Sequence, residues 1–420
     1  MPKISTQPVT CRQIAARVQG VPWLFLALFS LAHAANAMSY NGLAPIASFV
    51  QNELQLTKAQ LGTITGAFSL GIFAASIPTG WLVDRLGARQ MLFWGQVAVA
   101  VFTAVFAFSF NFWPILLANT LAGAGYACLN PATNKAVLCC FPKNVRATAM
   151  GTKQMGVALG TAAAAAILPA LALTFSWRVG LLAVAALVST TALMSFIFYR
   201  IEEEKSQASF LKSLSLKEIF RNNKLLLLGV MGMAFTGAQV CFTTYAVIFL
   251  QEALALPPVE AGSYLSLALI CAAIARISWG VISDRFFGGR RRPVLLLLAL
   301  LAAAMAAVLS VLPPGMPSWI LAPVVAIMGM TAVGWNGLQM TLVSEAAGRQ
   351  KTGFATGFTL AIGYLGSIFG PPLFGYLVDL TGQYRISWLM LTGIMLAIAL
   401  VLAIFKMEEH MGIPRGLDTP

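Results

Sequence analysis

Charged side chains are scarce in this sequence. Asp, Glu, Lys and Arg make up 10% of the 420 residues, whereas hydrophobic residues make up 59%. A soluble globular domain carries about 25% charged residues to cover its surface. The mean hydropathy of +0.81 points the same way. This composition excludes a soluble enzyme and a disordered scaffold.

Cysteine is also sparse, and its spacing is uninformative. The six cysteines show no metal-ligand spacing and are expected to be reduced thiols, which excludes a disulfide-stapled secreted module. The sequence contains no nucleophile–base set, metal-binding cluster or phosphate-binding loop. We therefore expect a protein that is not an enzyme and that needs neither a cofactor nor a metal.

Long apolar runs dominate instead. A helix that crosses a bilayer needs about 20 mainly apolar residues. Turn and charge signals divide the chain into twelve such spans, which predicts an all-α membrane protein. The expected spans are 22–49, 59–83, 91–109, 114–141, 145–173, 177–199, 224–251, 260–283, 293–312, 318–344, 350–378 and 386–406.

The net charge of +13 reports orientation in the membrane. With the N-terminus in the cytoplasm, twenty-one Lys and Arg residues lie inside and only Lys58, Arg178 and Arg385 lie outside, as the positive-inside rule requires. The segment up to Ala37 imitates a cleavable signal peptide, but its removal would leave an odd number of spans, so we expect it to be retained. Both termini are expected in the cytoplasm, with the protein in a bacterial inner membrane.

The sequence also repeats itself. GWLVDRLGAR follows the second span at residues 80–89, and GVISDRFFGGR follows the eighth at 280–290. Gly156 and Gly160 in the fifth span match Gly366 and Gly370 in the eleventh. Two six-helix halves of this kind place a substrate cavity at their interface. The expected divisions are a tail at 1–21, a first half at 22–199, a linker at 200–223, a second half at 224–406 and a tail at 407–420.

Acidic residues are missing from the interior of every span. The charges left there are Lys135, Lys153 and Arg276, with His33 as a titratable neighbour. Ionisable groups inside a membrane are costly and are functional candidates by default. Cations without a carboxylate from the protein can be balanced by the substrate, so the pattern favours an anionic solute.

Ten intramembrane residues are candidates for substrate binding. Arg276 leads because its guanidinium matches the fork of a carboxylate, although pairing with helix carbonyls or Asp284 is the alternative. Lys153 can instead snorkel to the surface, and His33 can be either a proton-coupling group or a neutral structural histidine. The candidates are Arg276, Lys153, Gln154, His33, Asn36, Tyr126, Asn130, Tyr245, Asn336 and Gln339.

The two DR-containing loops suggest gating. A Gly one turn before an Asp lets a helix end approach its neighbour, and the Asp can pair with an Arg or a helix N-terminus there. Solvated loop charges are the alternative. These loops resemble the signature of the major facilitator superfamily, and the resemblance covers nearly the whole chain. It implies a gating role for Gly80, Asp84, Arg85, Arg89, Gly280, Asp284, Arg285 and Arg290.

The resemblance also implies alternating access, with the first, fifth and eighth spans lining a central cavity where His33, Lys153 and Arg276 can converge. Arg276 resembles the helix-8 arginine of oxalate/formate-type and monocarboxylate-type members. We therefore expect a monomeric secondary transporter of a small organic anion, with proton coupling left open. Its partners are the anionic solute and membrane lipid, and nucleic acid is not expected. Proton-coupled efflux of drugs is the alternative, and a transporter-like sensor is a further one.

Overall fold

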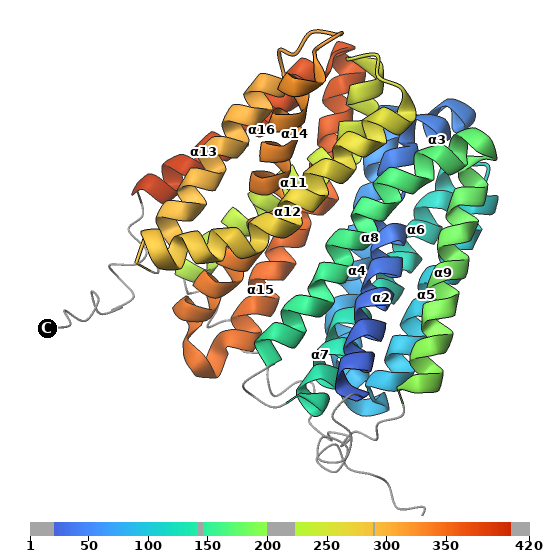
Figure 1. Cartoon of the computed structure of the whole chain (residues 1–420), viewed down its shortest axis with the longest axis vertical. Coiled ribbons are helices and arrows are strands. Elements are labelled where there is room, and N and C mark those ends of the chain that lie inside the picture. The colour runs from blue at the N-terminus through green and yellow to red at the C-terminus, as the bar shows by residue number, and fades with distance from the viewer. Residues whose placement is uncertain (1–20, 142–145, 200–222, 289, 405–420) are drawn as a thin grey trace, which may run out of the picture. The chain divides into compact units, whose positions relative to one another are not determined.

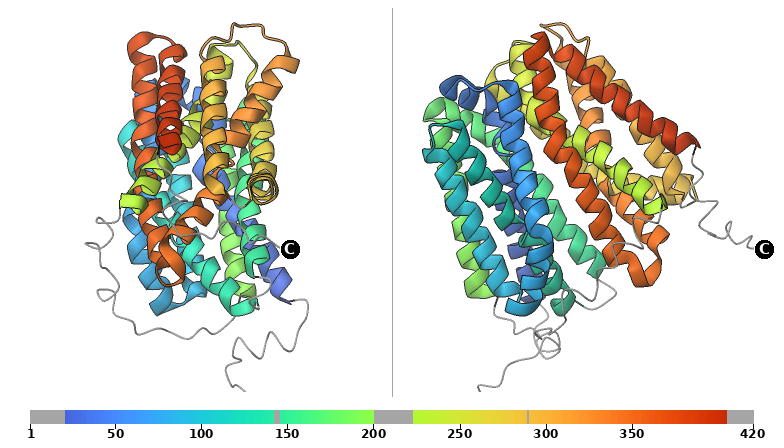
Figure 2. Two further views of the ribbon diagram at one scale, coloured as in Figure 1. Left: turned by 90° about the vertical axis from the view of Figure 1, so that its left-hand side faces the viewer. Right: turned by 180° about the vertical axis from the view of Figure 1, so that it is seen from behind.

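The computed structural model describes residues 21–141, 146–199, 223–288 and 290–404 (Figure 1). Within these ranges the regular structure is entirely helical, as both views of Figure 2 also show. The expected tails and the linker at 200–223 lie almost wholly outside the described residues. The division of the chain at that linker therefore stays a prediction.

The helices follow the expected spans closely. In the first half they are α2 (Val21–Asn41), the 3₁₀ helix η1 (Ala44–Ile46), α3 (Ala47–Leu54), α4 (Lys58–Leu86), α5 (Ala88–Phe108), α6 (Phe112–Tyr126), α7 (Leu129–Cys140), α8 (Arg146–Thr174) and α9 (Trp177–Phe198). In the second half they are α11 (Asn223–Glu252), α12 (Pro258–Phe286), α13 (Arg291–Leu309), α14 (Ser318–Ala332), α15 (Asn336–Thr381) and α16 (Tyr384–Ile404).

Eleven stretches of the described helices are long and apolar enough to cross a membrane. The helix α2 is not among them, although its 21 residues match the length of a span. His33 and Asn36 lie in α2 and lower its hydropathy. With α2, the described helices supply the twelve expected spans of an all-α membrane protein.

Three expected spans are interrupted. The first ends as a helix at Asn41 and is followed by η1 and α3. The fourth breaks between α6 and α7 because Pro131 has no N–H for the carbonyl of Ala127, which accepts the Thr79 hydroxyl at 3.3 Å instead. The tenth breaks between α14 and α15, where Gly334 lies in a poor helix-forming stretch.

The expected loop between the tenth and eleventh spans is helical instead. The helix α15 continues over 46 residues from Asn336 to Thr381 and includes positions 345–349. Its two ends still belong to separate membrane spans, Ser318–Val343 and Phe358–Thr381. The residue types Ala, Gln, Arg and Lys favour helix. The charged residues between the tenth and eleventh spans therefore do not end α15.

The predicted repeat is visible in how the helices cross. A Cβ added at Gly156 on α8 would lie 2.1 Å from the carbonyl oxygen of Ser30 on α2. At Gly366 on α15 it would lie 1.9 Å from that of Met233 on α11. In each half the fifth helix therefore packs directly on the first, as the matched glycines predicted.

Contacts among the Cα atoms group the chain into two compact units. The first contains Met1–Tyr40, Leu70–Thr161 and Arg178–Ser213, and the second contains Asn41–Ser69, Ala162–Trp177 and Leu214–Pro420. The second unit therefore includes two segments from the first half of the sequence. Both segments lie at the predicted outer end of their spans.

Candidate functional site

A buried cation lies in the first unit. The side chain of Lys153 on α8 is 1% exposed, and its Nζ donates to Thr133 Oγ1 at 2.9 Å and to Asn134 Oδ1. His33 Nε2 lies 3.1 Å from the same Thr133 hydroxyl. We call His33, Thr133, Asn134 and Lys153 the Lys153 cluster. Its lysine is held inside the protein, so the alternative of snorkelling to the surface does not describe this structure.

Glycine packing explains why the cluster forms. Gly156 and Gly160 let α8 approach α2 at Ser30 and Ala34, on either side of His33. This close crossing brings Lys153 and His33 to one hydroxyl on α7. Sequence analysis singled out both charged residues but neither Thr133 nor Asn134. The sequence signal for these two residues was their position as a polar pair next to the break in the fourth span.

Two further candidates flank this cluster. Gln154 Nε2 donates to Asn130 Oδ1 at 3.1 Å, one turn before Asn134 on α7. Asn36 is fully buried and bonds Gln96 Oε1 at 3.2 Å and the Ala32 carbonyl at 2.8 Å. Asn36 therefore connects helices in this structure, whereas Gln154 is exposed.

Tyr126 is buried at the end of α6, with its ring centroid 5.8 Å from that of Tyr40. The third intramembrane lysine, Lys135, donates to the carbonyl of Val83 at 3.1 Å, near the end of α4.

The second unit contains a separate polar group around Gln239. Its Oε1 accepts from Trp335 Nε1 at 3.1 Å and from Asn336 Nδ2 at 3.3 Å, at the break between α14 and α15. A Cβ added at Gly337 would lie 3.6 Å from the Arg276 carbonyl, so α12 contacts α15 next to this group. The backbones of α12 at Arg276 and of α15 at Gly337 are therefore adjacent. Sequence analysis did not single out Gln239, because its partners Trp335 and Asn336 come from a different part of the chain.

Two candidates are placed in structural roles. Gln339 is 1% exposed and donates to the Leu228 carbonyl at 2.9 Å. Tyr245 is fully buried, and its hydroxyl contacts the carbonyls of Lys58 and Pro371 at 2.7 and 2.9 Å. Both therefore hold helices together in this structure.

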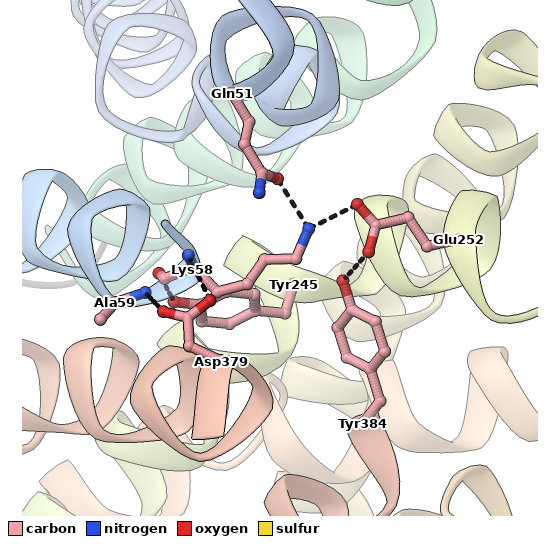
Figure 3. A network of polar contacts seen from close by, with 7 residues as sticks. All are labelled: Gln51, Lys58, Ala59, Tyr245, Glu252, Asp379 and Tyr384. Atoms are coloured by element: carbon pink, nitrogen blue, oxygen red, sulfur yellow. Dashed lines mark hydrogen bonds and ion pairs between the residues drawn. The ribbon is translucent and has the colours of Figure 1, made fainter. Parts of the chain in front are cut away.

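Tyr245 belongs to a polar network at the predicted outer end, shown in Figure 3. Lys58 Nζ donates to Gln51 Oε1 at 2.7 Å and forms an ion pair with Glu252. Tyr384 donates to the other Glu252 oxygen at 2.8 Å. We call these residues, together with Asp379, the outer network.

Asp379 caps the helix that begins at Lys58. Its two carboxylate oxygens accept from the backbone N–H groups of Lys58 at 2.8 Å and Ala59 at 2.7 Å (Figure 3). A carboxylate is stabilised there by the positive end of the helix dipole. The contact joins α4 of the first sequence half to α15 of the second.

The gating residues at the other end are only partly described. The side chains of Asp84 and Asp284 lie outside the described part of the chain. A close approach at Gly280 is not present, because an added Cβ there would meet no atom within 4 Å. Arg89 donates to the Phe196 carbonyl at 2.9 and 2.7 Å, so it caps α9. Arg85, Arg285 and Arg290 are exposed, and the surroundings of Gly80 lie outside the described part of the chain.

The equivalent of Arg89 in the second half differs from the predicted one. Sequence spacing matched Arg89 to Arg290, but Arg292 is the residue that donates to the end of α16, at Leu402 and Ala403, at 2.6 and 2.8 Å. Arg89 is five residues after Asp84, whereas Arg292 is eight residues after Asp284, so the second loop is three residues longer. Both arginines lie at the start of a third helix and cap the sixth helix of their half.

Buried acidic residues are missing from the described spans. The buried polar side chains there include Lys153 and His33 but no Asp or Glu. Both hydrogen-bond acceptors of Lys153 are neutral. The sequence-based expectation of intramembrane cations without a fixed carboxylate is confirmed for Lys153.

Eleven apolar spans of the described helices, together with α2 and the polar groups enclosed among them, define a polytopic membrane protein. The family model of the Major Facilitator Superfamily matches residues 29–371. The chain belongs to this superfamily of membrane transporters, which confirms the resemblance in the DR loops.

Relatives and a solved structure span nearly the whole chain. The hexuronate transporter of Bacillus subtilis (strain 168) is 25% identical over 92% of this chain and 95% of its own. A probable L-galactonate transporter of Escherichia coli (strain K12) is 22% identical over 96% and 93%. A bacterial homologue of the human lysosomal transporter Spinster shares the fold, with a TM-score of 0.73 at 18% identity over 92% and 96%.

Proposed function

We propose that this protein is a secondary active transporter of small organic anions, with sugar acids as the substrate class. The observation that carries the proposal is the buried Lys153, whose partners Thr133 and Asn134 are both neutral. A positive charge in a low-dielectric interior attracts an anion when no carboxylate of the protein balances it. The relatives named for hexuronate and L-galactonate favour the same class.

Neutral amides suit the rest of such a substrate. A sugar acid has one or two carboxylates and several hydroxyls, which donate and accept hydrogen bonds. Asn130 and Gln154 lie beside the Lys153 cluster, and Gln239 and Asn336 bond each other at the break between α14 and α15. We propose that the cations favour an anionic substrate through their charge and that the amides form its hydrogen bonds.

The remaining assignments are proposals of the same kind. We propose a monomer in a bacterial inner membrane with both termini in the cytoplasm, as the charge asymmetry predicts. Transport is by alternating access between the two halves, with Asp84, Asp284 and their neighbours controlling the cytoplasmic end. The basis for proposing proton coupling is the titratable group of His33, which lies beside Lys153.

Ligand binding to purified protein tests the function. A ligand that binds the folded state raises the melting temperature by mass action. We expect D-glucuronate to stabilise the protein, and nitrate and the lipophilic cation tetraphenylphosphonium to stabilise it less. Stabilisation by the cation alone would instead support the efflux alternative.

Variants of Arg276 test the proposed function in an uptake assay. We expect Arg276→Ala to abolish D-glucuronate uptake into cells and Arg276→Lys to reduce it strongly, because an ammonium cannot make the bidentate contact of a guanidinium. Arg385→Ala removes an exposed arginine at the outer end and serves as the control. Normal uptake by folded, membrane-inserted Arg276→Ala would remove its assigned role.

A further inference from the structure

The contact with Lys153 fixes how the Asn134 amide is oriented. A lysine ammonium has three donors and no acceptor, so the Asn134 atom that it contacts must be the carbonyl oxygen. The chemistry of lysine therefore fixes the orientation of this amide. Asn134 Nδ2 then points away from Lys153, and within the described residues it makes no hydrogen bond.

The lysine itself is enclosed. Its side chain is 1% exposed, so an anion cannot reach Nζ without displacing the helices around it. Asn134, in contrast, is exposed. It lies six residues before the end of α7, which is about 9 Å from the helix end. Polar side chains at this depth face the interior of the helix bundle or water rather than lipid.

We propose that Asn134 is a substrate-binding residue and that Lys153 is the positioning residue behind it. The ammonium holds the amide oxygen, so the amide presents only its NH2 donors to the cavity. Hydrogen bonds in a chain polarise one another, and the nearby charge makes these N–H groups stronger donors. The proposal rests on the proposed function, because it assigns the group that contacts the carboxylate of the anion.

Asn134→Asp separates this role from a structural one. Aspartate keeps an acceptor for Lys153 and adds an ion pair, so a purely structural role would be preserved. It also replaces the NH2 donors with an oxygen that repels a carboxylate. We expect the Kd for D-glucuronate, measured by calorimetry on the full-length protein, to rise at least about tenfold. The melting temperature without ligand should be unchanged or higher.

Two controls complete the experiment. Gln383→Glu introduces the same kind of charge at an exposed position of the outer end and should leave the Kd unchanged. Lys153→Met and Asn134→Ala should each weaken binding, and the double variant should weaken it no more than the stronger single one, because both act through one group. Wild-type Kd in Asn134→Asp, or additive effects in the double variant, would overturn this inference alone. Failure of the wild type to bind D-glucuronate would overturn the proposed function with it.

The outer network carries a second, independent inference. Its contacts join α3 and α4 of the first sequence half to α11, α15 and α16 of the second, and all of them lie in one compact unit (Figure 3). Glycines bring the backbones together: an added Cβ would lie 2.3 Å from the Pro371 carbonyl at Gly62, and 2.3 Å from the Lys58 carbonyl at Gly375. The halves thus meet here at backbone distance.

The charges in this network are matched. Glu252 balances the Lys58 ammonium, and Asp379 balances the N-terminus of α4. We infer that the outer network is a latch that holds the outer end closed and that opens when Asp379 leaves α4. Once opened, all three charged groups can be hydrated, so the latch is reversible.

Removing the cap tests the latch. In Asp379→Asn we expect the amides at the start of α4 to exchange hydrogen roughly fivefold faster, as for a helix that loses its N-cap. The KM for external D-glucuronate should fall, because a larger fraction of the protein is open to the outside. Glu260→Gln, which neutralises an exposed acid at the same end, should change neither quantity.

Exchanging the charges of Lys58 and Glu252 distinguishes a latch from a contact that is needed only for folding. Lys58→Glu alone should raise the outward-open fraction, and Lys58→Glu with Glu252→Lys should return the KM toward the wild-type value. Unchanged exchange and unchanged KM in Asp379→Asn would overturn the latch.

Discussion

At the scale of residues, the two buried lysines show that position decides the role of a charge. Lys58 is paired with Glu252 at a helix start, whereas Lys153 lies among neutral acceptors inside the membrane. The Lys58 pairing balances its charge within the protein, whereas Lys153 has no fixed carboxylate among its hydrogen-bond partners in the described part of the chain. Residue type alone does not distinguish the two, because the partner of each comes from another helix.

The sequence left two roles open for His33, a proton-coupling group and a neutral structural histidine, and its surroundings favour the second. It is fully buried, its Nε2 contacts Thr133 at 3.1 Å, and its Nδ1 has no acceptor in the described part of the chain. A second proton would therefore create a buried N–H without a partner, next to the charge of Lys153. This environment favours a neutral histidine.

We expect His33→Gln to leave the pH profile of D-glucuronate uptake unchanged, while uptake itself falls because the contact with Thr133 is altered. The measurement is the initial rate between about pH 5 and 8, the range in which an ordinary histidine titrates. A flattened profile would contradict this expectation and would assign proton coupling to His33.

At the scale of elements, patterns local to one helix were predicted well. The small-residue spacing of Gly156 and Gly160, and of Gly366 and Gly370, predicted close crossings, and the partner helices are equivalent in the two halves. Apolar run length predicted the spans, because each span must match the same bilayer.

Breaks inside spans were not predicted. The interruptions after Tyr126 and Ala332 lie within continuous apolar runs, so hydropathy does not mark them. Pro131 was a visible signal, but a proline in a membrane helix is often accommodated without a break. Polar groups from other helices, such as the Thr79 hydroxyl, decide whether a break is tolerated.

At the scale of the whole molecule, the proposed cycle requires each end to close in turn. The outer network supplies matched charges for one end. For the cytoplasmic end the DR loops remain the basis of the prediction, since the side chains of Asp84 and Asp284 lie beyond the described part. Two copies at equivalent positions favour a shared mechanical role.

We expect Asp84→Asn to increase the fraction of protein open to the cytoplasm, because an uncharged side chain no longer holds a helix N-terminus or an arginine. An impermeant maleimide applied to inside-out vesicles should label a cysteine at position 154 faster in this variant. Asp84→Glu keeps the charge and should label at nearly the wild-type rate. Equal labelling in Asp84→Asn would count against gating by this residue.

The sequence by itself determined the membrane class, the number of spans, the internal repeat and the family. These properties depend on composition, run length and short local motifs, which each segment carries separately. Only the tertiary structure decided which polar groups meet: that Lys153 bonds Asn134, that Gln239 bonds Trp335 and that Asp379 caps α4. Such pairings join residues from different helices, and their distances depend on how closely the helices cross rather than on either local sequence.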